Sequence, residues 1–167
     1  MTNSLRLLFA AATIALVTSG CGQKDTSSAP ATTAAAPAPA GPRTEELTAG
    51  DNMKYDKTTI EAKAGEQLTV ILTNIGSQPK EVMGHNWILL KAGVDAEAFD
   101  KAAAKATTSE YFPAELADQV ITHIPLLGPR KSGQVTFQVP TVPGEYVFLC
   151  SYPAHFQTGM RGVLVVK

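Results

Sequence analysis

Short segments in which apolar and polar residues alternate dominate the sequence from about residue 44 onward. Residues 67–74 and 133–140 read QLTVILTN and GQVTFQVP, so every second side chain is apolar over most of each segment. This period is typical of a β-strand with one buried face. Similar runs, bounded by glycine- and proline-containing turns, occupy residues 58–62, 86–90, 119–124, 144–150 and 162–167. Seven or eight short strands at this spacing predict an all-β fold, an antiparallel β-sandwich.

One segment departs from the alternation. Residues 95–106, DAEAFDKAAAKA, are rich in alanine, begin with Asp95 as a suitable N-cap, and place apolar residues at helical intervals. We therefore expect one short helix, on a loop that crosses outside the sandwich. The sequence has no internal repeat and no glycine-rich phosphate-binding loop.

The first twenty residues have the pattern of an export signal. A polar start with Arg6 leads into the apolar stretch 7–17, which is too short to span a bilayer as a mature helix. Small residues then precede Cys21, an arrangement that resembles a bacterial lipoprotein cleavage site, although Thr18 stands where that motif prefers leucine. We expect Cys21 to be lipidated and the protein to be held on a membrane in the periplasm or at the cell surface. Ordinary signal-peptide cleavage is the alternative.

The residues after Cys21 differ in composition from the alternating region. Residues 21–43 are dominated by alanine, proline, serine and threonine, which lack the apolar side chains that a packed core needs. The sequence thus predicts a signal peptide at 1–20, a lipidated cysteine with a disordered linker at 21–43, and one domain at 44–167. The formal net charge of −1 offers no basic face, so we expect no nucleic-acid partner.

The domain holds a single cysteine, Cys150, because Cys21 lies before it. A lone thiol in an exported protein can be inert packing, a nucleophile or a metal ligand. Here His155 follows five residues later and Met160 five residues after that, within one loop between two predicted strands. Thiolate, imidazole and thioether are soft or borderline donors, which suit copper better than magnesium, calcium or manganese.

A fourth ligand has to come from elsewhere in the chain. His85 is the better candidate, because it comes just before a predicted strand and follows Gly84, whose backbone carbonyl is free to approach a metal. His123 has no second donor near it in sequence, and we expect it to be structural or on the surface. Two histidines and a cysteine with a weak axial methionine form the blue-copper electron-transfer pattern.

The segments VMGHNWIL and C-x4-H-x4-M-x-G, the latter before a final strand, resemble the azurin branch of the cupredoxins. The resemblance covers about three quarters of the chain and implies a cupredoxin-like Greek-key β-sandwich of seven or eight strands with one short helix. It implies a type 1 copper bound by His85, Cys150 and His155, with Met160 as axial ligand and the Gly84 carbonyl as a weak second axial neighbour.

The same resemblance implies roles for three residues around the metal. Asn86 would tie the two ligand-bearing segments together by hydrogen bonds. The backbone N–H of Tyr152 would orient the thiolate. Met83 would belong to an apolar partner-docking patch around the exposed edge of His155.

Three departures from azurins are visible. Azurins place the methionine four residues after the histidine, whereas this chain uses five, as in auracyanin and rusticyanin. The family's N-terminal disulfide has no counterpart here. Asn74 replaces a histidine that titrates in many azurins, so the family's pH-linked behaviour is not transferred.

These residues are compatible with three functions. The first is a monomeric, membrane-anchored electron carrier, not an enzyme, that cycles one electron between redox partners such as cytochromes, oxidases, reductases or reaction centres. The alternative is a copper-binding or delivery lipoprotein without a redox role, which usually shows methionine- or histidine-rich surface clusters that this sequence lacks. A thiol enzyme using Cys150 and His155 ranks last, because the tight loop offers no orienting third group.

Overall fold

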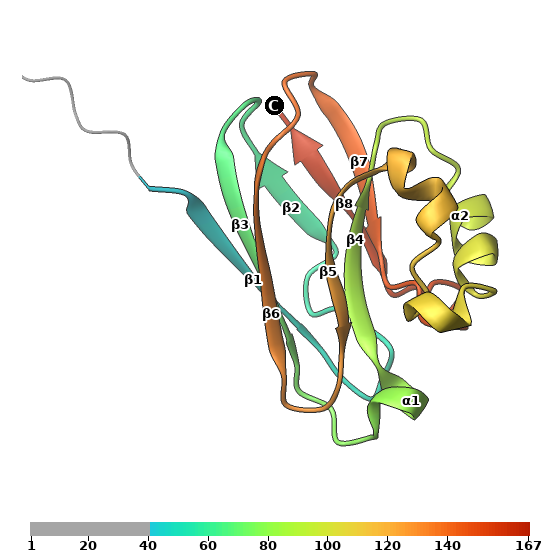
Figure 1. Cartoon of the computed structure of the whole chain (residues 1–167). Coiled ribbons are helices and arrows are strands. Elements are labelled where there is room, and N and C mark those ends of the chain that lie inside the picture. The colour runs from blue at the N-terminus through green and yellow to red at the C-terminus, as the bar shows by residue number, and fades with distance from the viewer. Residues whose placement is uncertain (1–40) are drawn as a thin grey trace, which may run out of the picture. The chain divides into compact units, whose positions relative to one another are not determined.

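Within residues 41–167, eight strands form two sheets that pack face to face in a β-sandwich (Figure 1). The computed structural model describes residues 41–167, so the export signal, Cys21 and most of the expected linker lie outside the described residues. One sheet has the strand order β1-β3-β6, and the other has the order β2-β8-β7-β4-β5. The strands are β1 (Arg43–Ala49), β2 (Thr59–Ala62), β3 (Gln67–Asn74), β4 (His85–Leu90), β5 (Val120–Leu127), β6 (Ser132–Gln138), β7 (Gly144–Leu149) and β8 (Arg161–Val166).

The alternating segments form the core as expected. In β3, Leu68, Val70 and Leu72 are fully buried between the sheets, and β6 pairs with it in antiparallel register. The hydroxyl groups of Thr69 and Thr136 lie on the opposite face of this pair and are 2.7 Å apart. The expected all-β sandwich of seven or eight strands is confirmed, and its core is the apolar face that the alternation predicts.

The strand pairing differs from the expected antiparallel arrangement in two places. The β1–β3 and β2–β8 pairs are parallel, while the other strand pairs are antiparallel. Strand β1 itself was not expected, and it begins at Arg43, inside the segment assigned to the linker. Only Leu47 and Ala49 of this strand are buried, so its sequence carries little periodic signal. Its partner in β3 lies 25 residues further along the chain.

Strand β4 is buried along its whole length because it is covered on both faces. Trp87 and Leu89 face the main core, whereas Ile88 and Leu90 belong to a second apolar cluster on the outer side of the sheet. The helix α2 (Ala96–Ala103) contributes Phe99 and Ala103 to this second cluster. The expected short helix outside the sandwich is therefore present (Figure 1).

Helix α2 begins as expected, because the Asp95 side chain accepts hydrogen bonds from the backbone N–H groups of Glu97 and Ala98. It ends three residues earlier than expected, where Lys105 and Ala106 make tighter i to i−3 hydrogen bonds. Three further short helical segments complete the domain: α1 (Lys80–Met83), η1 (Thr107–Ser109) and η2 (Ala114–Gln119). Within residues 41–167, no helix is long and apolar enough to cross a membrane.

Candidate metal centre

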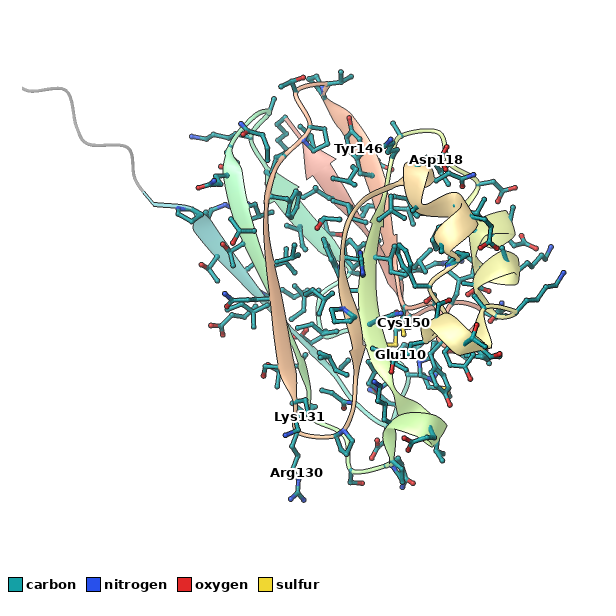
Figure 2. The ribbon with its side chains drawn as sticks, in the orientation of Figure 1. Glu110, Asp118, Arg130, Lys131, Tyr146 and Cys150 are labelled. Carbon is teal, nitrogen blue, oxygen red and sulfur yellow. The ribbon has the colours of Figure 1, made fainter. Side chains whose placement is uncertain are left out.

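The strand order brings the three sulfur- and imidazole-bearing segments to one end of the sandwich. Cys150 directly follows β7, and Met160 directly precedes β8, which is the antiparallel neighbour of β7. The Cys150 N–H donates to the Met160 carbonyl at 3.1 Å, which closes the loop between the two strands. His85 is the first residue of β4, on the other side of β7. In Figure 2, the label Cys150 marks the end of β7 at which these segments meet, and the label Tyr146 lies toward the opposite end of the strand.

The donor atoms of His85, Cys150 and His155 all lie within 4.8 Å of one another. The Cys150 sulfur is 3.4 Å from Nδ1 of His155, and the ring centres of the two histidines are 5.0 Å apart. All three side chains are at most 1% exposed, and Met160 is also fully buried. The structure thus gathers the predicted residues of the site in one enclosed place.

The donor atoms are short of hydrogen-bond partners. Neither ring nitrogen of His85 makes a hydrogen bond of good geometry in the protein, although both are buried and the Gly50 backbone lies near the ring. An unpaired buried polar group costs about 1–3 kcal/mol, so an imidazole kept in this state calls for a functional explanation. A metal ion is a natural partner for these nitrogens.

Burial also controls the protonation of the site. It lowers the pKa of His85, against the opposing effects of the Gly50 backbone and the Asp51 carboxylate. Burial, followed by the proximity of His85, lowers the pKa of His155 to about 4. For Cys150, burial raises the pKa of the thiol to about 12, although the backbone N–H groups of Asn86 and Tyr152 act to lower it. At neutral pH the metal-free site therefore holds two neutral imidazoles, ready to bind, and a thiol that must lose its proton.

The sequence profile of the copper-binding proteins of the plastocyanin/azurin family matches residues 44–167. The chain belongs to this family. It is 35% identical to an azurin from Bordetella pertussis over 122 residues, which are 71% of this chain and 80% of the azurin. It is 34% identical to auracyanin-A from Chloroflexus aurantiacus over 131 residues, 76% of each chain.

Solved structures agree with this assignment. The reduced auracyanin from Roseiflexus castenholzii superposes with a TM-score of 0.67 at 36% identity, covering 74% of this chain and 96% of the auracyanin. Auracyanin A from Chloroflexus aurantiacus, described as a "blue" copper protein, gives 0.66 at 34% identity, covering 76% and 100%. Together with the donor set, these relatives identify the cofactor of this blue copper protein as a type 1 copper.

In this cupredoxin, Asn86 joins the segment that carries His85 to the segment that carries Cys150. Its side-chain oxygen accepts from the Ser151 N–H at 2.9 Å, and its amide donates to the Ser151 hydroxyl at 2.8 Å. The Ser151 hydroxyl in turn donates to the Tyr111 carbonyl, and the Tyr55 hydroxyl donates to the Asn86 carbonyl. Ser151 was not singled out from the sequence. A polar residue that directly follows a buried strand and a candidate ligand is the signal that marks it.

The environment of His155 differs from the expected one. We expected an exposed edge on this histidine, but the residue is only 1% exposed. The Tyr152 ring lies 4.7 Å from the imidazole, and its hydroxyl donates to the Glu81 carbonyl of α1 at 2.5 Å. A phenylalanine at this position would lack the hydroxyl for this link. Tyr152 is thus fixed between His155 and α1 and helps to cover the imidazole.

The glycines near the site are required for several reasons. A Cβ on Gly84 would lie 2.7 Å from the Lys80 carbonyl oxygen and 2.9 Å from Cγ of Leu126, so this glycine allows α1 and β5 to pack closely. Gly159 has a φ of 94°, which bends the loop just before Met160. Gly162 lets the Phe148 ring and the Thr58 carbonyl pack against β8.

The remaining singled-out residues lie outside the donor cluster. Met83 is half-buried at the end of α1, one residue before Gly84. His123 is exposed on β5 and stacks on Phe112, with ring centres 4.3 Å apart. Asn74 is fully buried, and its amide group donates to the Leu127 carbonyl and accepts from the Gly76 N–H.

Proposed function

We propose that this protein is an exported one-electron carrier with a type 1 copper centre. His85, Cys150 and His155 serve as the equatorial ligands, Met160 as the axial ligand, and the Gly84 carbonyl as a weak second axial neighbour. The observation that carries the proposal is the fully buried cluster of two imidazoles and a thiol, with a buried methionine at the end of the same loop. This donor set is typical of electron-transfer copper and differs from sites that use open positions for catalysis.

Bound copper supplies the Cu(II)/Cu(I) couple, and the protein supplies a frame that stays nearly the same in both states. The hydrogen bonds between Asn86 and Ser151 fix the distance between the His85 and Cys150 segments. The backbone bond between Cys150 and Met160 fixes the two ends of the ligand loop. Because the donors are already held in place and sheltered from water, little reorganisation accompanies the gain or loss of an electron.

The proposal includes a place and a mode of docking. We propose lipid attachment at Cys21 in the periplasm or at the cell surface, a monomeric state, and a redox protein as partner. Two exposed apolar side chains, Ile75 and Val82, lie on the connection between β3 and β4, together with the half-buried Met83. Because this connection leads directly to His85, we propose it as the docking surface, with His155 beneath it and not on it.

The test of the copper centre is the visible spectrum of the purified protein loaded with Cu(II). We expect an intense thiolate-to-copper band that bleaches on reduction and returns on reoxidation. The Cys150→Ser variant should lack the band. Cys21→Ser is the matched control, because it replaces the other cysteine and should keep the colour. A colourless Cu(II) protein would refute the proposed centre.

Two further measurements separate the carrier from a copper-delivery protein and test the anchor. A carrier retains the metal through repeated redox cycles, whereas a delivery protein loses it in one oxidation state to a chelator or acceptor. Membrane fractionation tests the anchor: the wild-type chain should sediment with membranes, and Cys21→Ser should be released.

A further inference from the structure

The four residues between His155 and Met160 set where the methionine reaches the copper site, and they form a closed turn. The Met160 N–H donates to the His155 carbonyl at 2.9 Å, and the Gly159 N–H donates to the Phe156 carbonyl at 2.9 Å. Ala154, just before His155, and Gly159, at the end of the turn, both have positive φ angles, 69° and 94°. A displacement of this turn therefore moves the Met160 backbone and its thioether.

Residues outside the ligand loop hold this turn in place. Phe156 is buried in the outer apolar cluster with Phe99 and Ala103 of α2. The Lys54 ammonium donates to the carbonyl of Thr158. The side-chain amide of Gln157 donates to Oδ2 of Asp100, which is also on α2. Three consecutive residues of the turn are thus held from outside the ligand loop, Phe156 and Gln157 by α2 and Thr158 by Lys54.

Asp100 is the unusual member of this set. It is 1% exposed, in the buried stripe of α2 between Phe99 and Ala103, whereas the other charged residues of the helix, Glu97 and Lys101, face solvent. Its Oδ1 has no hydrogen-bond partner in the protein. Burying a carboxylate is costly unless it is fully paired, so packing alone does not account for an acid here.

The charge of Asp100 is also felt at the copper site. Burial raises the pKa of its carboxyl group, and the hydrogen bond from Gln157 acts in the opposite direction and favours the ionised form. The Asp100 carboxylate in turn is one of the groups that raise the pKa of Cys150. A negative charge that acts on this ligand also favours the more positive oxidation state of a metal bound there.

We propose that Asp100 is a positioning residue for the copper centre, which acts through Gln157 to hold the turn at residues 156–159 and so fixes the approach of the Met160 thioether. This inference rests on the proposed copper centre. It assigns a function to α2, which contributes none of the proposed ligands, and to the extra residue between the histidine and the methionine. Gln157 belongs to this longer turn and meets the helix at Asp100.

Two variants separate the position of the turn from the charge of Asp100. Gln157→Met keeps the size of the side chain and the Asp100 carboxyl group but removes the donor. Asp100→Asn keeps an acceptor oxygen for Gln157 but removes the charge. Glu97→Gln is the matched control, since it removes the same charge from the solvent-facing side of the same helix. All are compared at the same pH.

In the Cu(II) protein, Gln157→Met should change the intensity ratio of the thiolate-to-copper bands and the shape of the electron paramagnetic resonance spectrum, both of which report the metal geometry. Asp100→Asn should keep the wild-type ratio but raise the reduction potential, and Glu97→Gln should leave both unchanged. In the metal-free protein, the Met160 amide should exchange with deuterium roughly tenfold faster in Gln157→Met, because a charge-assisted hydrogen bond that holds the turn is lost.

Wild-type spectra and wild-type exchange in Gln157→Met would overturn the proposal and leave Asp100 as a packing residue of α2. A shift in potential in Glu97→Gln equal to that in Asp100→Asn would overturn the specific coupling to the site. If the proposed copper centre itself were wrong, the wild-type Cu(II) protein would be colourless, which differs from both of these outcomes. Deuterium exchange in the metal-free chain would still test whether Gln157 holds the turn.

Discussion

The two ends of the sandwich handle polar groups in opposite ways. At the metal pole, formed by His85, Cys150, His155 and Met160, the polar side chains are at most 1% exposed and the nitrogens of His85 are unpaired. At the charged pole, at the far ends of β2 and β8, Arg43, Glu61, Lys63, Glu66 and Lys167 line an open hollow of about 400 Å³. There Arg43 pairs with Glu66 at 3.1 Å and Lys167 with Glu61 at 2.8 Å, in contact with solvent.

The difference shows which property marks the functional end of this domain. The charged pole has a large hollow and several charges, but its groups are paired or hydrated and gain little from a ligand. At the metal pole the donor side chains are enclosed, yet the His85 nitrogens lack hydrogen-bond partners that the protein could have supplied. Unpaired buried polarity, not the size of a hollow, therefore identifies the site.

The largest expected effect on stability comes from binding a metal to the His85 imidazole or from removing that imidazole. Zn(II), which is redox-inert, should stabilise the metal-free protein by about 4 kcal/mol at a thousandfold excess over its dissociation constant. His85→Leu should abolish this gain and raise the stability of the metal-free protein by roughly 1–3 kcal/mol, because two unpaired buried nitrogens are removed. Chemical denaturation with and without Zn(II) measures both. A His85→Leu protein that is much less stable without metal would contradict the comparison.

The next effect is the pH dependence of the metal-free protein. The folded chain protonates His155 only near pH 4, whereas the unfolded chain does so near its ordinary pKa of 6.5. The unfolded state therefore binds protons first as the pH falls, and stability present above about pH 6.5 is lost toward pH 4. The expected slope is up to about 1.4 kcal/mol per pH unit for each buried histidine.

Denaturation curves at pH 7.5, 6 and 5 measure this slope. Since burial also lowers the pKa of His85, the His85→Leu variant should show a shallower slope than wild type. Equal slopes in the two proteins would mean that the histidines of the metal pole do not cause the pH dependence of the free energy of unfolding.

The proposed ligands could be predicted from the sequence because Cys150, His155 and Met160 lie close together in one loop. Of the two remaining histidines, His85 was the better candidate for the fourth ligand. Sequence reasoning also predicted β3 and β6, because the alternation of apolar and polar residues in a strand shows which face is buried. It missed β1, where two buried residues carry little periodic signal and the pairing is with a strand 25 residues away. It did not single out Asp100, since only the docking of α2 against the ligand loop shows that this position is buried.

We expect an intermediate effect on stability from the polar groups of the metal pole that do have hydrogen-bond partners. Asn86→Ala removes both hydrogen bonds to Ser151 and leaves the buried N–H of Ser151 without its acceptor. We expect a loss of about 1–3 kcal/mol in the free energy of unfolding. We also expect a change in the Cu(II) spectrum, because the two ligand-bearing segments are no longer tied together. Asn86→Asp, which keeps the acceptor for the Ser151 N–H, should recover part of the stability.

The smallest effect is expected at the charged pole. Arg43→Ala breaks the ion pairs with Glu45 and Glu66, but the arginine side chain is 39% exposed and water replaces its partners at little cost. We expect a loss of at most about 1 kcal/mol, which shrinks further at 1 M salt, and an unchanged copper spectrum. Denaturation at low and high salt measures the loss. A cost above about 2 kcal/mol that persists in salt would mean that the charged pole is held by more than solvated ion pairs, and the contrast between the two ends would no longer rest on pairing and exposure.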